Sequence, residues 1–392
     1  MLAVTTVPDI ESVGIVGGSL GGLFQAVALA ELGLDVTVWE RSAGRPDDRG
    51  AGIVLQPSVA WFLRMFCGVD PDRISVPVTH RQFFSLDGKS HHTLMRQRMI
   101  SWGAIYTSLR DRLDPARYHE GAQVTALVPR PEGVDVQVGG AVRSVDLAII
   151  ADGSASRHRR LVAPEGAPRY AGYVAYRGVI DEADLSQELS EVFRDRFSFY
   201  DGDRTQFLSY FIPGDLGTTA PGRRRMNWVW YVRADAAGLE RITTDRNGTV
   251  HGLSLPPGLI APQVHAELLD RARALLPGPM RELVEHTREP FAQAILDGHV
   301  SRMRAGRMLL TGDAAFVVRP HTAASVEKAA ADAIALFTAL LQVPSLDGAL
   351  RAWEKNRLAE GTALHRHGIG LGDRLGLSSS EATQAAAAGP AA

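Results

Sequence analysis

The chain has 392 residues, of which 45% are hydrophobic, and its formal net charge at pH 7 is −2. This composition allows a large buried core and gives no electrostatic case for a nucleic-acid partner. No apolar run approaches the roughly 18 residues that a membrane span needs. A single cysteine, Cys67, excludes a disulfide framework and a Cys-rich metal site. With no signal-peptide pattern at the start, we expect a cytoplasmic protein.

The first elements in the chain are a predicted strand, helix and strand. Residues 12–16 form an apolar run typical of a buried strand. Apolar residues then recur at helical spacing from Leu20 to Leu32, and Gly33 provides a stop signal. Residues 35–40 alternate as a second strand. This order predicts a βαβ unit.

The turn between the first strand and the helix reads Gly17-x-Ser19-x-x-Gly22, with serine where a dinucleotide fingerprint has its middle glycine. Such a turn must be tight, approach a pyrophosphate closely and pack helix against strand, which Gly17, Gly21 and Gly22 allow. The helix N-terminus then faces the phosphates. Glu40 ends the second strand, where a carboxylate can bind the adenosine ribose. Together these features favour a bound dinucleotide over an ordinary tight turn.

Two later strands end in an acidic residue beside a glycine. Residues 145–151 lead into Asp152-Gly153, which alone is equally typical of a turn. Residues 306–313 end in Gly312-Asp313, whose carboxylate can accept a hydrogen bond from a ribityl hydroxyl. A helix expected from near Thr322 would direct its positive N-terminus at the flavin N1/C2 carbonyl. A solvated Asp at a helix start is the alternative, but combined with the early glycine turn the pattern indicates FAD.

Between about residues 170 and 290 the sequence becomes rich in aromatic strand patterns separated by glycine and proline turns. Strands are predicted at 172–180, 206–212 and 226–233, as an antiparallel sheet inserted into the α/β framework. Helical patterns follow at 323–341 and 347–365. From Ser378 onward the chain has little to bury, so we expect a mobile tail.

In this order the motifs resemble the FAD-dependent aromatic hydroxylases of the para-hydroxybenzoate hydroxylase type, the class A flavoprotein monooxygenases. The resemblance covers residues 12–365. It rests on the Gly17–Gly22 turn with Glu40-Arg41, on Asp152-Gly153-x-x-Ser156 with Arg159, on Gly312–Ala315 with Pro320, and on Arg110 before Leu113. The segments that look most like the 2,6-dihydroxypyridine 3-hydroxylase group are 171–180, 211–214 and 319–324.

The sequence departs from the family at two places near the third motif. Phe316 stands where the family usually has histidine, and Ala323-Ala324-Ser325 replaces a Gly-x-Gly loop. The backbone amides of that loop can still face the flavin, but alanine makes the loop stiffer than glycine would.

The resemblance implies an α/β fold in which a Rossmann-type FAD-binding domain carries an inserted antiparallel-sheet substrate domain, followed by C-terminal helices. The implied FAD-binding segments are 1–75, 101–168 and 291–345. The implied substrate segments are 76–100 and 169–290. A C-terminal helix would span 346–377, and the mobile tail 378–392. The segment Gly50-Ala-Gly52 is the expected flexible edge of the flavin site.

The resemblance also implies the reaction. NADH or NADPH would reduce non-covalent FAD, and O2 would form a flavin C4a-hydroperoxide that hydroxylates an electron-rich hydroxypyridine-like or phenolic ring. A homodimer is a further expectation. The implied cofactor contacts are Gly17, Ser19, Gly21, Gly22, Glu40, Arg41, Val54, Arg110, Val124, Asp152, Asp313, Ala323 and Ala324.

The candidate residues for the chemistry are fewer. His321, in the loop before the flavin-facing helix, is the candidate base for a ring hydroxyl, with a structural histidine as the alternative. The candidate substrate contacts are Gln56, Tyr210 and Trp230. Because side chains alternate along a strand, only every second aromatic residue there can face the pocket. Core packing is the alternative for both aromatic residues.

Other flavoprotein functions were weighed against this interpretation. Trp228-Val-Trp230 is similar to the Trp-x-Trp signature of flavin halogenases, but the Ile-Pro that should follow is missing and no lysine is suitably placed. An oxygen-independent FAD reductase or dehydrogenase, and a non-enzymatic flavoprotein, both stay open. So does a tailoring enzyme that performs epoxidation or Baeyer–Villiger insertion.

Overall fold

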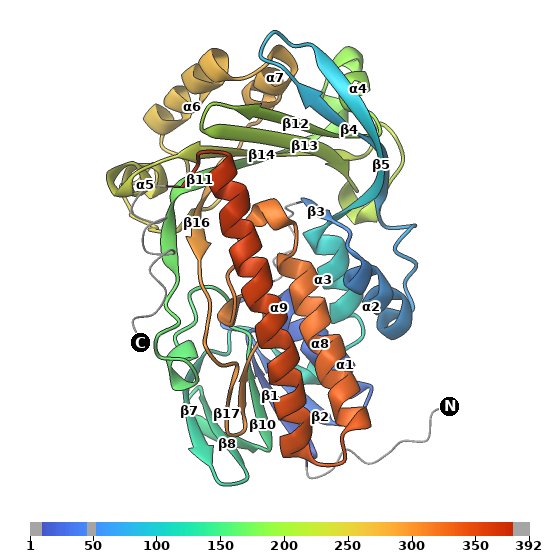
Figure 1. The fold of residues 1–392 in the computed structure, drawn as a ribbon, viewed down its shortest axis with the longest axis vertical. Helices are drawn as coiled ribbons and strands as arrows, with labels where there is room; N and C mark the ends of the chain where they lie inside the picture. The colour runs from blue at the N-terminus through green and yellow to red at the C-terminus, as the bar shows by residue number, and fades with distance from the viewer. Residues whose placement is uncertain (1–9, 45–51, 379–392) are drawn as a thin grey trace.

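The glycine turn lies at the edge of a six-stranded sheet in the computed structural model, which describes residues 10–44 and 52–378 (Figure 1). The strand order is β17 (Arg304–Ala305), β18 (Met308–Leu310), β10 (Leu147–Ile150), β1 (Ser12–Val16), β2 (Asp35–Trp39) and β6 (Tyr118–His119). β1 pairs in parallel with β2 and β10, and β10 pairs in parallel with β18. Parallel strands bring their carboxyl ends to one edge, so all three motifs meet there.

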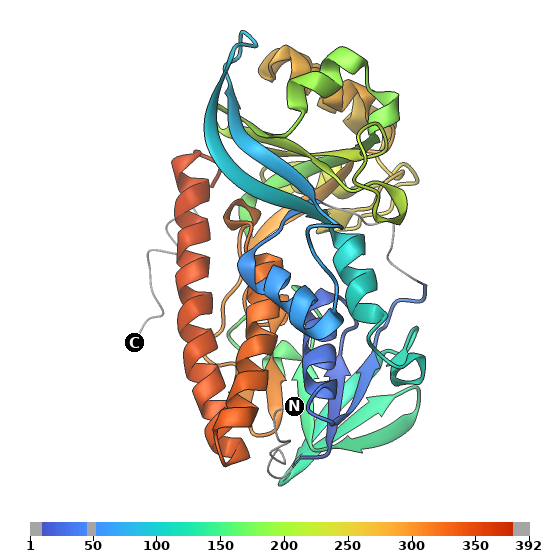
Figure 2. The ribbon, with the colours of Figure 1, turned by 90° about the vertical axis from the view of Figure 1, so that its right-hand side faces the viewer.

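Helices pack on this sheet and on one another through apolar faces. They are α1 (Leu20–Ala30), α2 (Pro57–Cys67), α3 (Trp102–Arg110), α8 (Ser325–Gln342) and α9 (Leu346–Arg374). α8 packs on α1 and α9 packs on α8, and Figures 1 and 2 show α8 and α9 side by side in the lower part of the molecule. One cluster of buried hydrophobic residues, with members from Ile10 to Trp353, forms the core of this part.

The predicted helix at 347–365 is longer in the structure, because α9 runs on to Arg374. Its last turns contain Gly368 and Gly372, which weaken the helical pattern in the sequence. Side chains at these two positions would meet Arg319, so glycine allows α9 to approach the loop before α8 closely.

The second large sheet has nine strands and confirms the expected antiparallel insertion. Its order is β15 (Ser254–Leu255), β16 (Phe291–Asp297), β11 (Arg169–Asp181), β14 (Arg225–Arg233), β13 (Thr205–Ile212), β12 (Arg196–Gly202), β4 (Val76–Phe84), β5 (Ser90–Ser101) and β3 (Gly52–Val54). All neighbours are antiparallel except β12 and β4. β16 pairs with β11, so residues 291–297 belong to this sheet and not to the FAD-binding segment in which we expected them.

Residues on the nine-stranded sheet alternate between two separate cores. On the outer face, Trp228 and Trp230 pack with four helices: α4 (Gln187–Phe193), α5 (Ala236–Thr243), α6 (Pro262–Leu275) and α7 (Gly278–His286). Figure 1 shows α4, α6 and α7 beyond the sheet, away from the glycine turn. The other residues of the same strands form an inner face toward the FAD-binding part, where Tyr173 and Tyr231 share one cluster and Tyr210 lies in another.

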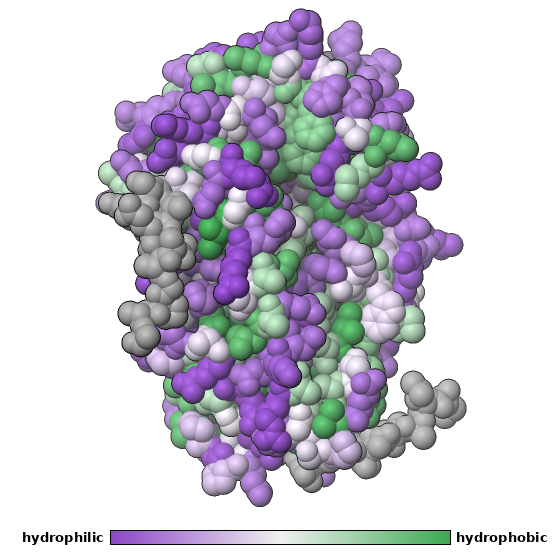
Figure 3. All heavy atoms as spheres, viewed as in Figure 1, coloured by the Kyte–Doolittle hydropathy of each residue, from purple (hydrophilic) through white to green (hydrophobic). Residues whose placement is uncertain are grey.

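A small third sheet consists of β7 (Val124–Arg130), β8 (Gly133–Val138) and β9 (Ala141–Val145). In the described part of the chain, no helix combines the length and apolarity needed to cross a membrane. Hydrophilic residues dominate the face in Figure 3, with hydrophobic ones in small groups between them. Gly50, Ala51 and the tail beyond Ser378 lie outside the described residues.

Candidate active site

The first turn requires glycine for steric reasons that the sequence predicted. Gly17 has a φ of 104°, and a Cβ there would lie 2.5 Å from the carbonyl oxygen of Ala151. A Cβ on Gly22 would collide with the carbonyl oxygen of Gly17, which shows how tightly helix α1 packs against the turn. Ser19, the α1 N-cap, is exposed and makes no side-chain cap hydrogen bond. The turn is therefore shaped for close approach by a ligand.

Glu40 and Arg110 lie beside this turn. The Gly18 N–H donates to Glu40 Oε2 at 2.7 Å, and the Tyr118 hydroxyl donates to the Gly18 carbonyl at 2.9 Å. The Arg110 guanidinium lies over the Tyr118 ring, 4.4 Å from its centre. Arg41 follows Glu40 and is exposed. A carboxylate and two arginines lie next to a glycine turn that a phosphate can approach closely. This arrangement can hold the adenosine end of a dinucleotide. Val124, also expected there, begins β7 and is buried in the core.

The glycine of the third motif touches the first turn. A Cβ on Gly312 would lie 3.7 Å from the Cα of Gly21, and Gly312 has a φ of 58°. Its N–H donates to Asp332 Oδ2 at 3.1 Å, and Asp332 is itself paired with buried Arg357 at 2.7 Å. Sequence segments from opposite ends of the chain thus form one continuous cradle.

Arg159 connects the second motif to the third. Its guanidinium donates to the backbone carbonyls of Gly153, Ser154, Asp313 and Ala314 over 2.6–3.2 Å. Arg159 is only 5% exposed, so its charge is largely removed from water. The four hydrogen bonds offset the cost of that burial. Arg159 therefore fixes the two acidic motifs relative to each other.

Two buried polar atoms in this cradle have no hydrogen-bond partner among the described residues. Oδ1 of Asp152 is buried without a hydrogen bond, although Oδ2 contacts His158 Nδ1 at 2.9 Å. Lys328 is 1% exposed, and its Nζ makes no hydrogen bond but lies 3.6 Å from Asp313 Oδ1. Unmade hydrogen bonds of buried groups cost about 1–3 kcal/mol each. An acceptor and an ammonium that both have unused hydrogen-bonding capacity beside the three motifs fit the hydroxyls and phosphates of FAD.

The loop before α8 differs from the expected arrangement in one respect. Ala323 and Ala324 were expected to present their amides to the flavin, but the Ala323 N–H donates to Pro320 O at 2.9 Å and the Ala324 N–H to Thr322 Oγ1 at 3.2 Å. Ala324 is the N-cap of α8 and gives the helix no side-chain cap hydrogen bond. The backbone amides that follow it in the first turn of α8 lack intrahelical partners, and they form the positive end of the helix. Ser325 adds a bond to Asp313 Oδ1 at 2.9 Å.

The expected ring-facing residues gather at the inner face of the nine-stranded sheet. Val54, Tyr210 and Ala323 belong to one apolar cluster. The Gly52 N–H donates to Asn227 Oδ1 at 2.9 Å, which anchors the edge strand over that cluster. Gln56 is the N-cap of α2, and its side chain makes no cap hydrogen bond. The structure thus joins the predicted flavin contacts to Tyr210.

Trp230, predicted as a substrate contact, lies on the opposite face of the sheet. It is fully buried among the outer-face residues, and its Nε1 donates to Thr205 Oγ1 at 2.7 Å. Alternation along β14 places its neighbour Tyr231 on the inner face instead. The expectation for Trp230 is therefore wrong, and Tyr231 takes its place beside the candidate site.

His321 lies in the predicted loop, but its surroundings do not suit a base. Nε2 is 3.0 Å from the Tyr173 hydroxyl, and Nδ1 is 3.0 Å from Gln206 Oε1. Burial, reinforced by the charge of Arg319, lowers its pKa to about 3. The ring centre of Tyr231 is 4.2 Å away. A neutral imidazole with both nitrogens bonded holds neighbouring residues in place more readily than it accepts a proton.

Sequence reasoning missed several polar residues at this site. Arg177, Asn227 and Gln206 lie on the inner face, and Lys328 lies in the first turns of α8. Arg177 carries the one signal that could have found it, because a charged residue in a strand of mostly apolar residues is unusual. The other three have ordinary positions in the sequence.

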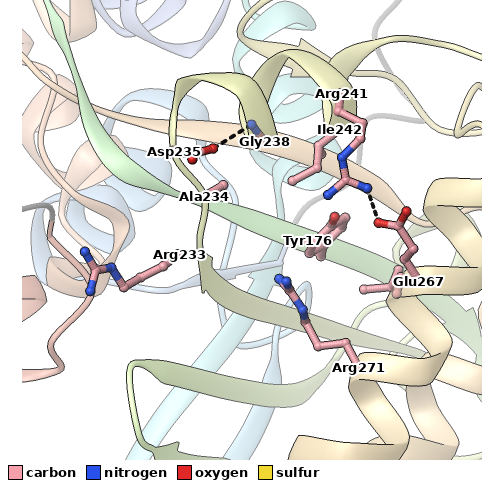
Figure 4. A pocket seen from close by; sticks show the side chains of 10 residues that line it. Tyr176, Arg233, Ala234, Asp235, Gly238, Arg241, Ile242, Glu267 and Arg271 are labelled. Carbon is pink, nitrogen blue, oxygen red and sulfur yellow. Dashed lines mark hydrogen bonds and ion pairs between the residues drawn. The ribbon is translucent and has the colours of Figure 1, made fainter.

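A separate cavity of about 240 Å³ lies on the outer side of the sheet (Figure 4). Arg241 pairs with Glu267 at its rim, and burial raises the pKa of Tyr176 in its wall to about 12. The lining residues are Tyr176, Arg233, Ala234, Asp235, Gly238, Arg241, Ile242, Glu267, Leu268 and Arg271. Tyr176 belongs to the outer core, so this cavity is distinct from the flavin cradle.

The fold and the three joined motifs define an FAD-binding oxidoreductase. A family model described as FAD binding domain-like matches residues 170–297. The 2,6-dihydroxypyridine 3-monooxygenase of Paenarthrobacter nicotinovorans is 34% identical, over 91% of this chain and 89% of the relative. The 6-hydroxynicotinate 3-monooxygenase of Bordetella bronchiseptica is 25% identical, over 90% of this chain and 89% of the relative. The solved 2,6-dihydroxypyridine-3-hydroxylase from Arthrobacter nicotinovorans has a TM-score of 0.88 and 32% identity, over 94% of this chain and 93% of that one.

The chain belongs to the FAD-dependent aromatic hydroxylases of the para-hydroxybenzoate hydroxylase type. It is an FAD-dependent monooxygenase with the fold that its sequence predicted.

Proposed function

We propose that this monooxygenase hydroxylates a hydroxypyridine-like ring with NADH or NADPH and O2. The observation that carries the proposal is the 34% identity with a 2,6-dihydroxypyridine 3-monooxygenase over nearly the full length of both chains. The polar inner face above the flavin cradle supports the same substrate class. The balanced reaction is Ar–H + O2 + NAD(P)H + H⁺ → Ar–OH + H2O + NAD(P)⁺.

The position of each residue indicates which part of the cofactor or substrate it would contact. FAD, when bound, supplies electron transfer and the activation of O2. Glu40 and Arg110 would hold the adenosine half, and Asp313 with Lys328 would hold the central part. Val54 and Tyr210 would form an apolar wall that keeps water away from the reacting ring.

Product analysis under ¹⁸O2 tests the reaction type. The FAD-loaded enzyme would receive NADH or NADPH with 2,6-dihydroxypyridine, with 6-hydroxynicotinate, or with phenol. One ¹⁸O atom in the product together with substrate-stimulated NAD(P)H oxidation is the expected result. An unlabelled product would instead select the oxygen-independent reductase or dehydrogenase. A labelled epoxide or ring-inserted product would select a tailoring enzyme.

We also propose a cytoplasmic location and a homodimeric state for the protein. A single cysteine accords with a reducing cytoplasm. We propose a homodimer on the family resemblance, and light scattering after size-exclusion chromatography measures it directly. A mass equal to one 42.3 kDa chain would contradict the dimer.

A further inference from the structure

Arg177 lies on strand β11, on the inner face of the nine-stranded sheet. It lies opposite Val229 of β14, one pair along from Ala175 and Tyr231. On the other side, the next inner-face pair of β14 and β13 is Asn227 with Tyr210. Along the inner face, Arg177 therefore lies between Tyr231, which contacts His321, and the pair of Asn227 and Tyr210. This face of the sheet is turned toward the flavin cradle.

The deeply buried arginines of the described chain all have protein partners. Arg159 is bonded to four carbonyls, Arg224 pairs with Glu182, Arg319 with Asp297, and Arg357 with Asp332. Arg177 differs from all four. Within residues 10–44 and 52–378 this half-buried arginine forms no ion pair, and although its guanidinium hydrogen-bonds the Tyr231 hydroxyl, its Nε is buried without a partner. A buried donor that makes no hydrogen bond is costly, and a positive charge with no anion beside it suits a negatively charged ligand.

The groups around Arg177 cannot supply the missing negative charge. Burial raises the pKa of Tyr231 to about 12 and also raises the pKa of Tyr210, although the nearby Arg177 opposes both shifts. Burial likewise raises the pKa of Tyr173, and it lowers the pKa of His321 to about 3. At pH 7 these tyrosines are neutral phenols and the histidine is a neutral imidazole. None of them can serve as the counter-ion.

A second orphan donor lies on the same face. The Oδ1 of Asn227 is used by the Gly52 N–H, while its Nδ2 is buried without a partner. Residues Arg177 and Asn227 are diagonal neighbours across β11 and β14. Their two orphan nitrogens both donate and neither accepts, so the matching ligand has acceptor oxygens and a negative charge. The apolar cluster of Val54, Tyr210 and Ala323 beside them suits a flat ring.

We propose that Arg177 binds the ionised oxygen of the aromatic substrate, with Asn227 donating to a second acceptor on the ring, and thereby selects hydroxylated heteroaromatic rings that bind as monoanions. This inference rests on the proposed function. It adds a positioning and specificity role for two residues that no motif identifies. An anionic oxygen on the ring also makes the ring carbons more electron-rich, which favours their hydroxylation.

The test compares two probes on the FAD-loaded enzyme. 2,6-Dihydroxypyridine can ionise, whereas 2,6-dimethoxypyridine cannot. Binding of each is followed by the change in flavin absorption from pH 5 to pH 9. A charge-assisted hydrogen bond typically contributes ~10- to 150-fold in affinity. We expect the wild type to bind the ionisable probe more tightly as the probe loses its proton, and the dimethoxy probe with no such trend.

Three variants separate charge from structure. Arg177→Met should lose the ~10- to 150-fold preference for the ionised probe, and Arg177→Gln should lose most of it, while Arg177→Lys should keep part. The matched control is Arg143→Met, on exposed β9 of the small sheet, which should behave as the wild type. FAD content measures folding in each case. If Arg177→Met does not hold FAD, the preference for the ionised probe is compared between Arg177→Gln and Arg177→Lys instead, and a stronger preference in Arg177→Lys supports the inference.

The inference is overturned if the variants with normal FAD content keep the wild-type preference for the ionised probe, or if they weaken both probes equally. It is also overturned if the wild type binds neither probe. The proposed function fails separately. An enzyme that prefers the ionised probe but puts no ¹⁸O into any product would contradict the function and leave the role of Arg177 standing. Turnover without a preference for the ionised probe would do the reverse.

Discussion

The Tyr173 hydroxyl and His321 Nε2 lie 3.0 Å apart, at the point where the substrate sheet meets the loop before the flavin-facing helix. Gln206 Oε1 can only accept, so the His321 Nδ1 that contacts it carries the proton. Nε2 must then accept from Tyr173. This arrangement fixes one tautomer and links three segments of the chain, which explains why a histidine in this position needs to be neutral.

We therefore expect His321→Ala to act on cofactor retention. The variant should lose FAD, because the loop before α8 loses two hydrogen bonds, while the enzyme that keeps FAD should couple NAD(P)H oxidation to product normally. FAD content and H2O2 released per NAD(P)H measure the two effects. His365→Ala is a control, since His365 is another half-buried histidine, on α9. Full FAD content with oxygen transfer slowed ~10²–10⁴-fold would instead identify His321 as a general base.

The same histidine predicts acid sensitivity. Burial lowers the pKa of His321 to about 3, whereas an unfolded histidine titrates near 6.5. Below that value the unfolded chain binds a proton that the folded chain refuses, so stability falls as pH falls from about 6.5 toward 3. Between pH 7 and pH 5 the loss should reach about 2 kcal/mol. Urea unfolding at both pH values should show this loss reduced in His321→Asn, and an unchanged loss would contradict the assignment.

The parts predicted well from sequence are those where local pattern and tertiary environment agree. The βαβ unit follows from apolar periodicity and from glycines that the packing of Gly17 and Gly22 requires. The inner and outer faces of β14 could not be told apart, because Trp228 and Trp230 on one face are as apolar as Val229 and Tyr231 on the other. Only the position of the four outer helices decides between the two sets.

The end of α9 and the role of Arg177 were beyond the sequence for another reason. Gly368 and Gly372 weaken the helical pattern in the sequence. Their lack of a side chain allows α9 to pack closely against Arg319. An arginine in a strand can be paired, exposed or orphaned, and the difference depends on residues distant in the chain. Such features become visible only when the strands are side by side.

The cofactor contacts can be tested from both ends. Glu40→Ala should weaken the adenosine end and Asp313→Ala the ribityl end. Each variant loses a hydrogen bond involving a charged group, which typically costs ~1.5–3 kcal/mol, or roughly 10- to 150-fold in FAD affinity. Fluorescence titration of apoprotein with FAD measures the affinity. Asp135→Ala, in the small third sheet, is the matched control. Retention of wild-type affinity in both variants would show that the cofactor lies elsewhere.

Ala323 offers a test of the departure from the family loop. It has a φ of 52°, a left-handed conformation that costs a residue with a Cβ about 1–2 kcal/mol. Ala323→Gly relieves that strain but adds about 0.4–1 kcal/mol of unfolded-state entropy cost, so the net stability gain should be about 1 kcal/mol or less. The larger effect should be on the loop itself, because glycine lets it sample conformations that alanine forbids. We expect FAD to dissociate faster from Ala323→Gly than from the wild type.

The matched control for this prediction is Arg204→Gly. Arg204 has a φ of 53° in the turn between β12 and β13, so glycine there relieves a similar strain in a turn that contains none of the flavin motifs. Urea unfolding should show comparable stability changes in the two variants. The rate at which flavin fluorescence rises as FAD dissociates after dilution should separate them, with faster release from Ala323→Gly alone. Equal release rates in both variants and the wild type would mean that the stiffness of the alanine loop does not hold the flavin.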